Sequence, residues 1–301
     1  MKNFIGARSM PDLIYHSPND LDDLMSLLKN AKQKDGDFKI VAGCTDFIPA
    51  VRTGRWAFND GVNIIDIKKI KALEYIKKED NMLKIGACTR LTQILESSQV
   101  NENAQILAQA AIQMASLQVR NTATIGGNIC MSSPAADMAP ALLVLGAKVT
   151  LKDPKGEREI FLKDFFTGPG QNVLKPDQIL TQISFPIMGN DKAAHFLKIG
   201  TRTAVIISVV SAAVCLGIKN GVCENPKIAL GSVAPTPIRI RKAENFLNHK
   251  ILDDPTIEQC AKIVFEEVSP ITDLRSGEEY RKDMARTLVR RAIVACREKL
   301  E

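Results

Sequence analysis

Aromatic side chains are scarce in this sequence. Phe, Trp and Tyr make up only 5% of its 301 residues, so it lacks the interleaving of basic and aromatic residues that binds single-stranded nucleic acid. The basic excess is modest, with 40 Lys and Arg against 34 Asp and Glu. This balance suits an anionic ligand without requiring nucleic acid. We therefore expect no nucleic-acid partner.

Clustered metal ligands are missing as well. The seven cysteines and three histidines are widely spaced, and no Cys-x-x-Cys pair occurs. This pattern predicts neither a disulfide framework nor a zinc or iron-sulfur site. We expect reduced, buried thiols and no metal ion.

Long apolar runs and an export signal are also lacking. The longest apolar run, residues 205–218, contains Ser208 and Ser211 and is shorter than the ~20 residues that a membrane helix needs. The first residues contain no apolar stretch followed by a cleavage site. The sequence thus predicts no membrane span and a cytoplasmic location.

What is present is a mixture of short helical and strand patterns, which predicts an α+β chain rather than the regular alternation of a Rossmann fold. A first helix is predicted to begin at Ser17 and Pro18, before leucines at helical spacing. The other predicted helices are at residues 91–97, 103–116, 138–145, 241–248, 256–268 and 278–299. Strands are predicted at residues 38–42, 63–67, 74–78, 82–87, 148–152, 159–162, 179–186, 196–199, 208–218 and 227–233. A turn at Asn220 and Gly221 and a linker at residues 188–191 complete this pattern.

The first turn of interest follows the predicted strand 38–42 and reads Ala42-Gly43-Cys44-Thr45-Asp46. Successive backbone N–H groups at such a turn form an anion-binding concavity, and a glycine lets a phosphate approach closely. Thr45 adds a hydroxyl donor, whereas Asp46 is expected to hold the turn itself or a sugar hydroxyl. Taken alone, this segment favours an ordinary structural turn over a binding site.

A second polar turn reads Thr124-Ile125-Gly126-Gly127-Asn128. Paired glycines raise the entropy cost of ordering the backbone, so a structural or functional requirement is expected to explain them. A backbone edge laid against a flat or charged ligand would supply one, with Thr124 and Asn128 adding directed hydrogen bonds. A tight turn before a helix is the alternative. Neither turn matches the dinucleotide-binding or P-loop pattern.

The two turns belong to a series of ordered motifs that covers nearly the whole chain. The others are Gln118-Val119-Arg120-Asn121, Ser133-Pro134-Ala135-Ala136-Asp137, Phe166-Thr167-Gly168-Pro169-Gly170, Pro176-Asp177-Gln178-Ile179-Leu180, Phe196-Leu197-Lys198 and Val233-Ala234-Pro235-Thr236-Pro237-Ile238-Arg239. With these motifs the sequence resembles the FAD-binding medium subunit of molybdenum hydroxylases, the family of xanthine, nicotinate and carbon monoxide dehydrogenases.

The resemblance implies a fold and a division into domains. It implies a two-lobed FAD-binding domain of the vanillyl-alcohol-oxidase (PCMH) type at residues 1–188, with lobes at about 1–60 and 61–188. A smaller α+β domain of the carbon monoxide dehydrogenase flavoprotein kind, with a short antiparallel sheet and helices, would follow at residues 192–301.

The resemblance also implies which residues surround the cofactor. The two turns would enclose the FAD pyrophosphate, and Asp137 would lie close to the cofactor. The implied FAD-binding residues are Val41, Ala42, Gly43, Cys44, Thr45, Asp46, Phe47, Thr124, Ile125, Gly126, Gly127, Asn128, Ser133, Asp137, Ile179, Leu180 and Lys198. No side chain is expected to act as a catalytic acid or base, because the cofactor carries the redox chemistry.

Several of these residues have ordinary structural interpretations that remain open. Asp137 could serve only as a helix N-cap, and Lys198 could be solvated on its strand. Phe47 and Phe196 are expected in the core rather than stacked on the flavin. The C-terminal helix carries basic residues that predict a solvated face or a subunit contact, namely Arg281, Arg286, Arg290, Arg291 and Arg297.

Two departures from the family pattern bear on function. Relatives usually have Gly-Gly where this chain has Gly43-Cys44, so a positive φ at Cys44 would be strained, and its side chain could face the cofactor. Many relatives also have an acidic residue near Val205 or Ile206, close to the nicotinamide site of xanthine dehydrogenases. NAD as electron acceptor is therefore less firmly implied than FAD. The chain also lacks the insertion that carries a further iron-sulfur cluster in 4-hydroxybenzoyl-CoA reductases.

The resemblance implies a complex, with electrons passing from a molybdopterin large subunit through two [2Fe-2S] clusters of a small subunit to FAD and then to an acceptor such as NAD. We expect a dimer of heterotrimers and oxidation of a purine or another N-heterocycle such as xanthine on the large subunit. Two alternatives stay open. One is a self-sufficient FAD-dependent reductase or oxidase of the same fold, and the other is a nucleotide-binding assembly module without redox chemistry.

Overall fold

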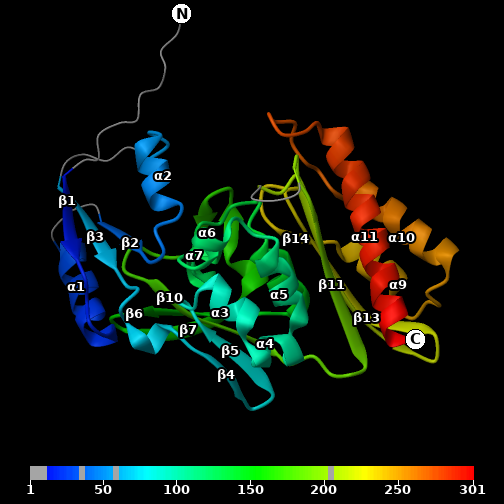
Figure 1. The fold of residues 1–301 in the computed structure, drawn as a ribbon, viewed down its shortest axis with the longest axis horizontal. Coiled ribbons are helices and arrows are strands. Elements are labelled where there is room, and N and C mark those ends of the chain that lie inside the picture. Colours follow the sequence, from blue (N-terminus) through cyan, green and yellow to red (C-terminus); the bar gives the residue numbers. More distant parts are fainter. Residues whose placement is uncertain (1–11, 34–37, 57–60, 203–206) are drawn as a thin grey trace, which may run out of the picture.

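The computed structural model describes residues 12–33, 38–56, 61–202 and 207–301. Figure 1 shows three parts side by side, with the N-terminal lobe at the left, a central lobe in the middle and the C-terminal domain at the right.

A small parallel sheet forms the N-terminal lobe. Its strands β1 (Leu13–His16), β3 (Val62–Asp66) and β2 (Phe38–Val41) pair in this order. Helix α1 (Leu21–Gln33) packs on this sheet through Leu24 and Leu28, which have no exposed surface. Because the strands are parallel, all three end at one edge, and the short helix α2 (Phe47–Arg52) begins there after β2. Ligands of parallel sheets bind at this edge.

The central lobe is built on an antiparallel sheet of five strands in the order β4-β5-β10-β6-β7. These are β4 (Ile76–Glu79), β5 (Met82–Gly86), β10 (Ile179–Pro186), β6 (Lys148–Asp153) and β7 (Gly156–Phe161). Its helices are α3 (Leu91–Glu96), α4 (Ser98–Asn103), α5 (Gln105–Ile112), α6 (Leu117–Arg120), α7 (Ile125–Cys130) and α8 (Met138–Leu145). The 3-10 turns Lys71–Leu73 and Leu162–Asp164 and the hairpin of β8 (Phe166–Gly168) and β9 (Gln171–Asn172) complete it.

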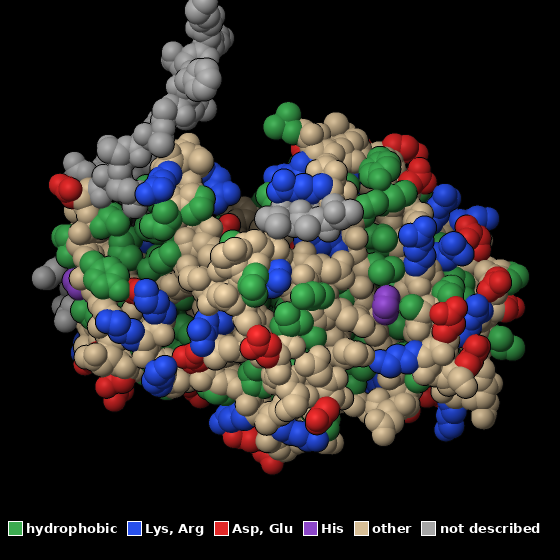
Figure 2. Space-filling model, viewed as in Figure 1, with side chains coloured by type: hydrophobic (Ala, Val, Ile, Leu, Met, Phe, Trp, Pro, Cys, Tyr) green, Lys and Arg blue, Asp and Glu red, His purple; other side chains and the backbone are tan. Residues whose placement is uncertain are grey.

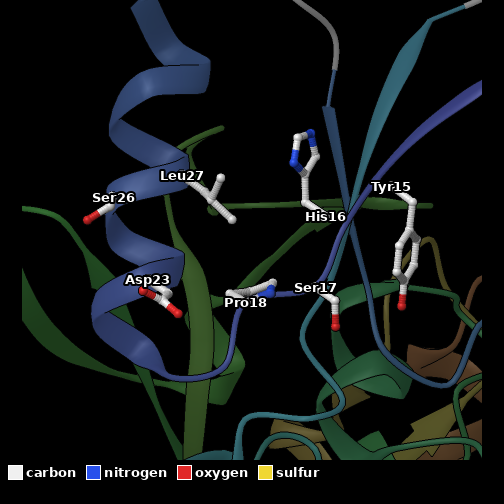
Figure 3. A pocket seen from close by; sticks show the side chains of 7 residues that line it. All are labelled: Tyr15, His16, Ser17, Pro18, Asp23, Ser26 and Leu27. Atoms are coloured by element: carbon white, nitrogen blue, oxygen red, sulfur yellow. The ribbon is translucent and has the colours of Figure 1, made fainter.

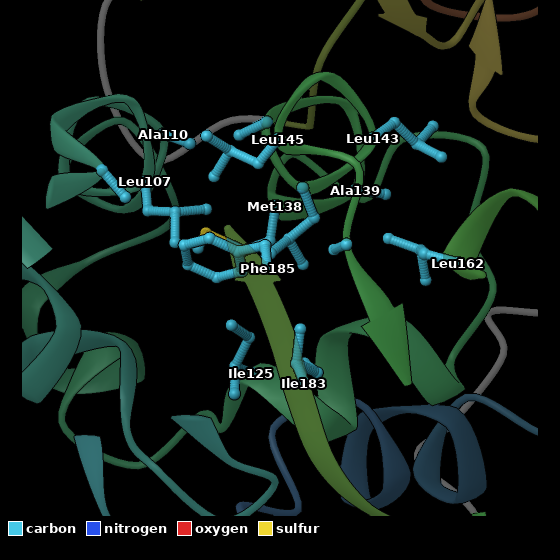
Figure 4. Packing of buried hydrophobic residues seen from close by; sticks show 14 of the residues in the cluster. Leu107, Ala110, Ile125, Met138, Ala139, Leu143, Leu145, Leu162, Ile183 and Phe185 are labelled. Carbon is cyan, nitrogen blue, oxygen red and sulfur yellow. The ribbon is translucent and has the colours of Figure 1, made fainter. Parts of the chain in front are cut away.

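Helix α8 is buried at every position, which explains why its sequence is apolar all round. It ends at Gly146, which has the left-handed conformation that favours glycine. Figure 4 shows Met138 and Ala139 of α8 facing Ile183 and Phe185 of β10, with Ile125 of α7 nearby. The core of the central lobe therefore joins the second polar turn to the sheet.

The C-terminal domain has an antiparallel sheet in the order β11-β12-β13-β14, with two faces that serve different cores. Its strands are β11 (Lys192–Ile199), β12 (Val210–Lys219), β13 (Val222–Gly231) and β14 (Ile238–Arg239). One face contributes Ala194, Phe196 and Ala213 to the core of the central lobe. The other face is covered by α9 (Arg241–Leu247), α10 (Asp254–Glu267) and α11 (Glu278–Leu300). Burial on both faces accounts for the apolar run in β12.

Several predicted elements are confirmed. The predicted strand 179–186 and helix 138–145 have the predicted bounds. The hairpin turn also forms, with positive φ at Asn220 and Gly221 as a two-residue turn requires. The α+β fold class is thus confirmed, and none of the described helices is long and apolar enough to cross a membrane.

Three local predictions are wrong. The helix predicted at 103–116 is too long, because the backbone of Ala104 (φ −160°, ψ 48°) is not helical: α4 ends at Asn103, and α5 covers only Gln105–Ile112. Strand β1 was not predicted, because two of its four residues are exposed and its sequence carries little alternation. The second polar turn is the beginning of helix α7 rather than a loop. In each case packing overrides the local pattern.

Candidate functional site

The first polar turn lies where β2 ends at the edge of the parallel sheet. None of the described residues accepts a hydrogen bond from the backbone N–H groups of residues 43–46. Cys44 has a φ of 55°, which confirms the predicted left-handed conformation at the second position. Its side chain packs against the small hydrophobic cluster of Val41 and Phe47. The turn thus has four backbone N–H groups that could donate hydrogen bonds to an anion.

The second polar turn is organised differently. Thr124 is the N-cap of α7, and its hydroxyl accepts from the Gly127 N–H at 3.1 Å. The N–H groups of Ile125 and Gly126 donate to the carbonyls of Thr89 and Ala87. Protein acceptors therefore occupy these backbone donors, so a ligand would instead meet the exposed Gly127 backbone and the Asn128 side chain. The buried oxygen Oδ1 of Asn128 has no hydrogen-bond partner in the described part of the chain.

The first turn contacts the two residues that precede the second turn, although some 80 residues separate them in the sequence. A Cβ on Gly43 would lie 2.2 Å from the Thr122 carbonyl oxygen and 2.9 Å from Cα of Ala123. Only glycine permits this approach, because the atoms that it meets belong to the backbone. Gly43 therefore lets the N-terminal lobe lie against the central lobe beside the second turn.

A buried carboxylate lies at the end of β3, beside the end of β2 that leads into the first turn. Asp66, at the end of β3, is 2% exposed. It accepts hydrogen bonds from the Tyr15 hydroxyl at 2.8 Å and the Lys68 N–H at 3.0 Å, and Lys68 Nζ lies 3.1 Å away. The bond to Asp66 raises the pKa of Tyr15, and burial raises the pKa of the Cys44 thiol. Cys44 is accordingly held as a neutral thiol within the turn.

A second polar cluster joins the central lobe to the C-terminal domain. Asp137, just before α8, lies 2.6 Å from Nζ of Lys198 on β11, and both side chains are 5% exposed. The hydroxyl of Ser208 donates to the other carboxylate oxygen. Burial raises the pKa of the Asp137 carboxyl, and the neighbouring Lys198 ammonium opposes this rise.

These contacts decide between the structural interpretations of Asp137 and Lys198. Asp137 occupies the N-cap position of α8, but its side chain makes no capping hydrogen bond. The capping interpretation is therefore wrong, because the carboxylate turns toward Lys198. The solvated interpretation of Lys198 is wrong for the same reason.

The structure places the remaining predicted residues in three settings. Phe47 and Phe196 are buried core residues, as expected, and Phe47 packs on Trp56 with ring centroids 6.0 Å apart. Ile179 and Leu180 are each 3% exposed, and they contact the cores of the N-terminal and central lobes, respectively. The residues of partial or full exposure beside the turns are Ala42, Thr45, Asp46 and Ser133.

The surface agrees with an anionic ligand between the lobes. Figure 2 shows a hollow between α2 and the C-terminal domain, with Lys and Arg side chains on both of its sides. Positive charge around a hollow raises the local concentration of an anion such as a dinucleotide.

A separate surface hollow of about 480 Å³ lies where β1 gives way to α1. Figure 3 shows His16 and Leu27 facing it from the strand and the helix. It is lined by Tyr15, His16, Ser17, Pro18, Asp23, Ser26 and Leu27. None of the predicted FAD-binding residues lines this hollow.

The residues at the two turns fit FAD. Free N–H groups at the first turn suit the pyrophosphate, and the orphaned Asn128 oxygen suits a hydroxyl or N–H donor of the cofactor. A buried carboxylate and ammonium could orient polar atoms of the ring system. In the described part of the chain, no group of three or more His, Cys, Asp or Glu could hold a metal ion.

Sequence reasoning missed the partners that hold these residues in place. Ser208, Asp66 and Tyr15 were not predicted as part of the site. The serines within the apolar run offered one signal, because a polar residue in a buried strand needs a partner. The segment near Val205 and Ile206 lies outside the described residues.

Comparisons with known proteins agree with this geometry. Residues 8–188 match the FAD binding domain in molybdopterin dehydrogenase, and residues 195–296 match the CO dehydrogenase flavoprotein C-terminal domain. The chain is 32% identical to the xanthine dehydrogenase FAD-binding subunit of Escherichia coli O157:H7, over 93% of this chain and 94% of that protein. It is also 32% identical to the nicotinate dehydrogenase FAD-subunit of Eubacterium barkeri, over 97% and 98%.

A solved structure has the same fold over nearly the whole length. Carbon monoxide dehydrogenase from Hydrogenophaga pseudoflava superposes with a TM-score of 0.91 at 28% identity, covering 97% of this chain and 99% of that one. Family, relatives and fold agree on one assignment. The chain belongs to the FAD-binding subunits of the molybdenum hydroxylases, and it is an FAD-binding oxidoreductase subunit.

Proposed function

We propose that this chain receives electrons from [2Fe-2S] clusters of a partner subunit and delivers them through FAD to an acceptor, most simply NAD. The contact of Gly43 with the Thr122 carbonyl carries this proposal, because it brings the two polar turns together between the lobes. Relatives named as FAD-binding subunits and medium chains support the view that the chain works within a larger enzyme.

In this proposal FAD lies between the lobes of residues 1–60 and 61–188. The free N–H groups of residues 43–46 hold its pyrophosphate, and Asn128 accepts a hydrogen bond from it. Asp137 and Lys198 orient the polar edge of the cofactor. When bound, FAD accepts electrons one at a time and releases them in pairs, which matches one-electron clusters to a two-electron acceptor.

The partners and the substrate follow from the same proposal. A molybdopterin large subunit would oxidise a purine or another N-heterocycle such as xanthine, and a small subunit would carry the clusters. Names of relatives that act on xanthine, nicotinate and caffeine favour an N-heterocycle. Because carbon monoxide and glyceraldehyde dehydrogenases are also among the relatives, the substrate is the first part of the proposal to test.

Flavin absorbance provides the test. The chain is purified alone and together with co-expressed partner subunits, and each preparation is mixed anaerobically with xanthine or with NADH. We expect xanthine to bleach the flavin only in the complex, whereas NADH bleaches it in both preparations. Turnover of an organic substrate by the isolated chain would instead support a self-sufficient flavoenzyme.

A further inference from the structure

The buried Asp137–Lys198 pair lies where the central lobe meets the C-terminal domain. A buried ion pair is stable only when further hydrogen bonds satisfy its remaining atoms. Lys198 Nζ donates to the Gln113 carbonyl at 3.1 Å. On the carboxylate, Lys198 contacts Oδ2 and the Ser208 hydroxyl donates to Oδ1. Ser208, which is 1% exposed, thus fixes the rotation of the carboxylate about its own axis.

Ser208 is itself held by a second serine. The Ser232 hydroxyl donates to the Ser208 carbonyl at 3.0 Å, and the Ser232 N–H donates to the Pro134 carbonyl at 2.8 Å. Pro134 lies three residues before Asp137, so Ser232 links the segment that carries the carboxylate to the serine that donates to it. Its φ of 64° places it in the left-handed region, which costs free energy for a serine. Such strain persists only where the surroundings impose it.

A buried arginine binds the backbone next to Ser208 and at Ser232. Arg281 of α11 is 3% exposed, although the basic C-terminal helix was expected to present a solvated face. Its Nη1 donates to the Val209 carbonyl at 2.7 Å and to the Ser232 carbonyl at 3.1 Å. Its Nη2 donates to Asp273 at 2.7 Å. The planar guanidinium thereby fixes the spacing of two strand ends in a way that a lysine could not.

We propose that Ser208 is a positioning residue for the cofactor, and that Ser232 and Arg281 transmit the packing of the C-terminal helix to Asp137. The C-terminal domain then sets how firmly the FAD-binding domain holds its cofactor. This inference depends on the proposed contact between Asp137 and FAD. It does not depend on any partner subunit, substrate or electron acceptor.

The test measures FAD affinity of the full chain by quenching of flavin fluorescence. Ser208→Ala removes a hydroxyl donor from a buried carboxylate, and we expect FAD to bind at least 10-fold more weakly, or about 1.4 kcal/mol. Ser184→Ala is the matched control, because the Ser184 hydroxyl also donates to a carboxylate, that of Glu159 at 3.2 Å, but in β10. We expect the control to bind FAD as the unmodified chain does.

A double-mutant cycle separates positioning from a general structural role. If Ser208 acts through Asp137, then Ser208→Ala weakens FAD binding little further once Asp137→Asn is present. Additive losses would overturn the proposal, as would unchanged affinity in Ser208→Ala. The visible circular dichroism of bound FAD is a second readout, which should change in Ser208→Ala and stay constant in Ser184→Ala.

A further variant keeps the proposal testable should Asp137→Asn fail to fold. Ser232→Ala removes the bond to the Ser208 carbonyl but leaves the ion pair intact, so FAD should bind about 3-fold more weakly or worse. If Ser232→Ala and the unmodified chain bound FAD with equal affinity, the C-terminal domain would not influence Asp137 through Ser232, and the proposal would be refuted. Failure of electron transfer with partner subunits would refute the proposed function but not the role of Ser208. The FAD titration of these variants contains no electron donor, so its result does not depend on electron transfer.

Discussion

The contact between the two polar turns leads to a specific prediction for Gly43→Ala. The new Cβ would lie 2.2 Å from the Thr122 carbonyl oxygen, and ordinary contact begins near 3.4 Å. The turns would therefore have to separate by about 1 Å. Rotation of a side chain cannot relieve the overlap, because the three nearest atoms, on residues 122 and 123, all belong to the backbone.

The expected free-energy cost of Gly43→Ala follows from the cost of overpacking. This cost is typically about 1–3 kcal/mol and is highest where the backbone must move. Since φ of Gly43 is not positive, alanine meets no additional conformational strain. FAD would lie between these turns, so most of the cost should appear as lost affinity. A cost of about 3 kcal/mol corresponds to roughly 100-fold weaker FAD binding.

Titration of the FAD-free chain with FAD, followed by fluorescence quenching, measures this loss. Gly277→Ala is the control, because a Cβ at Gly277 meets no atom within 4 Å and the residue precedes α11. We expect the control to bind FAD normally. If Gly43→Ala binds FAD within about 3-fold of the unmodified chain, then the contact between the turns does not position the cofactor.

Three further predictions concern stability and are tested by urea unfolding. Cys44→Gly should leave the free energy of unfolding unchanged or raise it by up to about 1 kcal/mol, because a φ of 55° is unfavourable for a non-glycine residue; a clear decrease would contradict this. Hydrogen bonds from Lys77 and Lys84 lower the pKa of Glu79 from 4.5 to about 2. This carboxylate therefore stabilises the fold above pH 4.5 and loses its effect as the pH falls toward 2. Glu79→Gln should accordingly be less stable than the unmodified chain at pH 7 but not at pH 2. A difference in stability that does not change with pH would contradict this. Glu244 is 4% exposed and pairs with two arginines, so Glu244→Gln should cost about 3 kcal/mol, and a loss below about 1 kcal/mol would show that the pair contributes little.

Local sequence signals predicted much of the fold, whereas the cofactor was implied by the family resemblance. Strand 179–186 and helix 138–145 were predicted with their bounds, because apolar runs between turn residues encode them directly. Gly43 of the first polar turn was also found from local sequence, since a close backbone approach needs a residue without a side chain. The sequence could not reveal what Gly43 approaches, because residues 122 and 123 meet it only in the folded chain.

The sequence by itself determined the α+β class and the two polar turns, since each depends on residues close together in the chain, and its series of motifs implied FAD through the family resemblance. Only the tertiary structure decided that Thr124 to Asn128 begin a helix, that Asp137 turns from capping toward Lys198, and that Ser208 completes the pair. These outcomes depend on burial. A carboxylate removed from water forms an ion pair and a hydrogen bond with the ammonium and hydroxyl groups that pack against it. No local sequence pattern specifies which residues supply those groups.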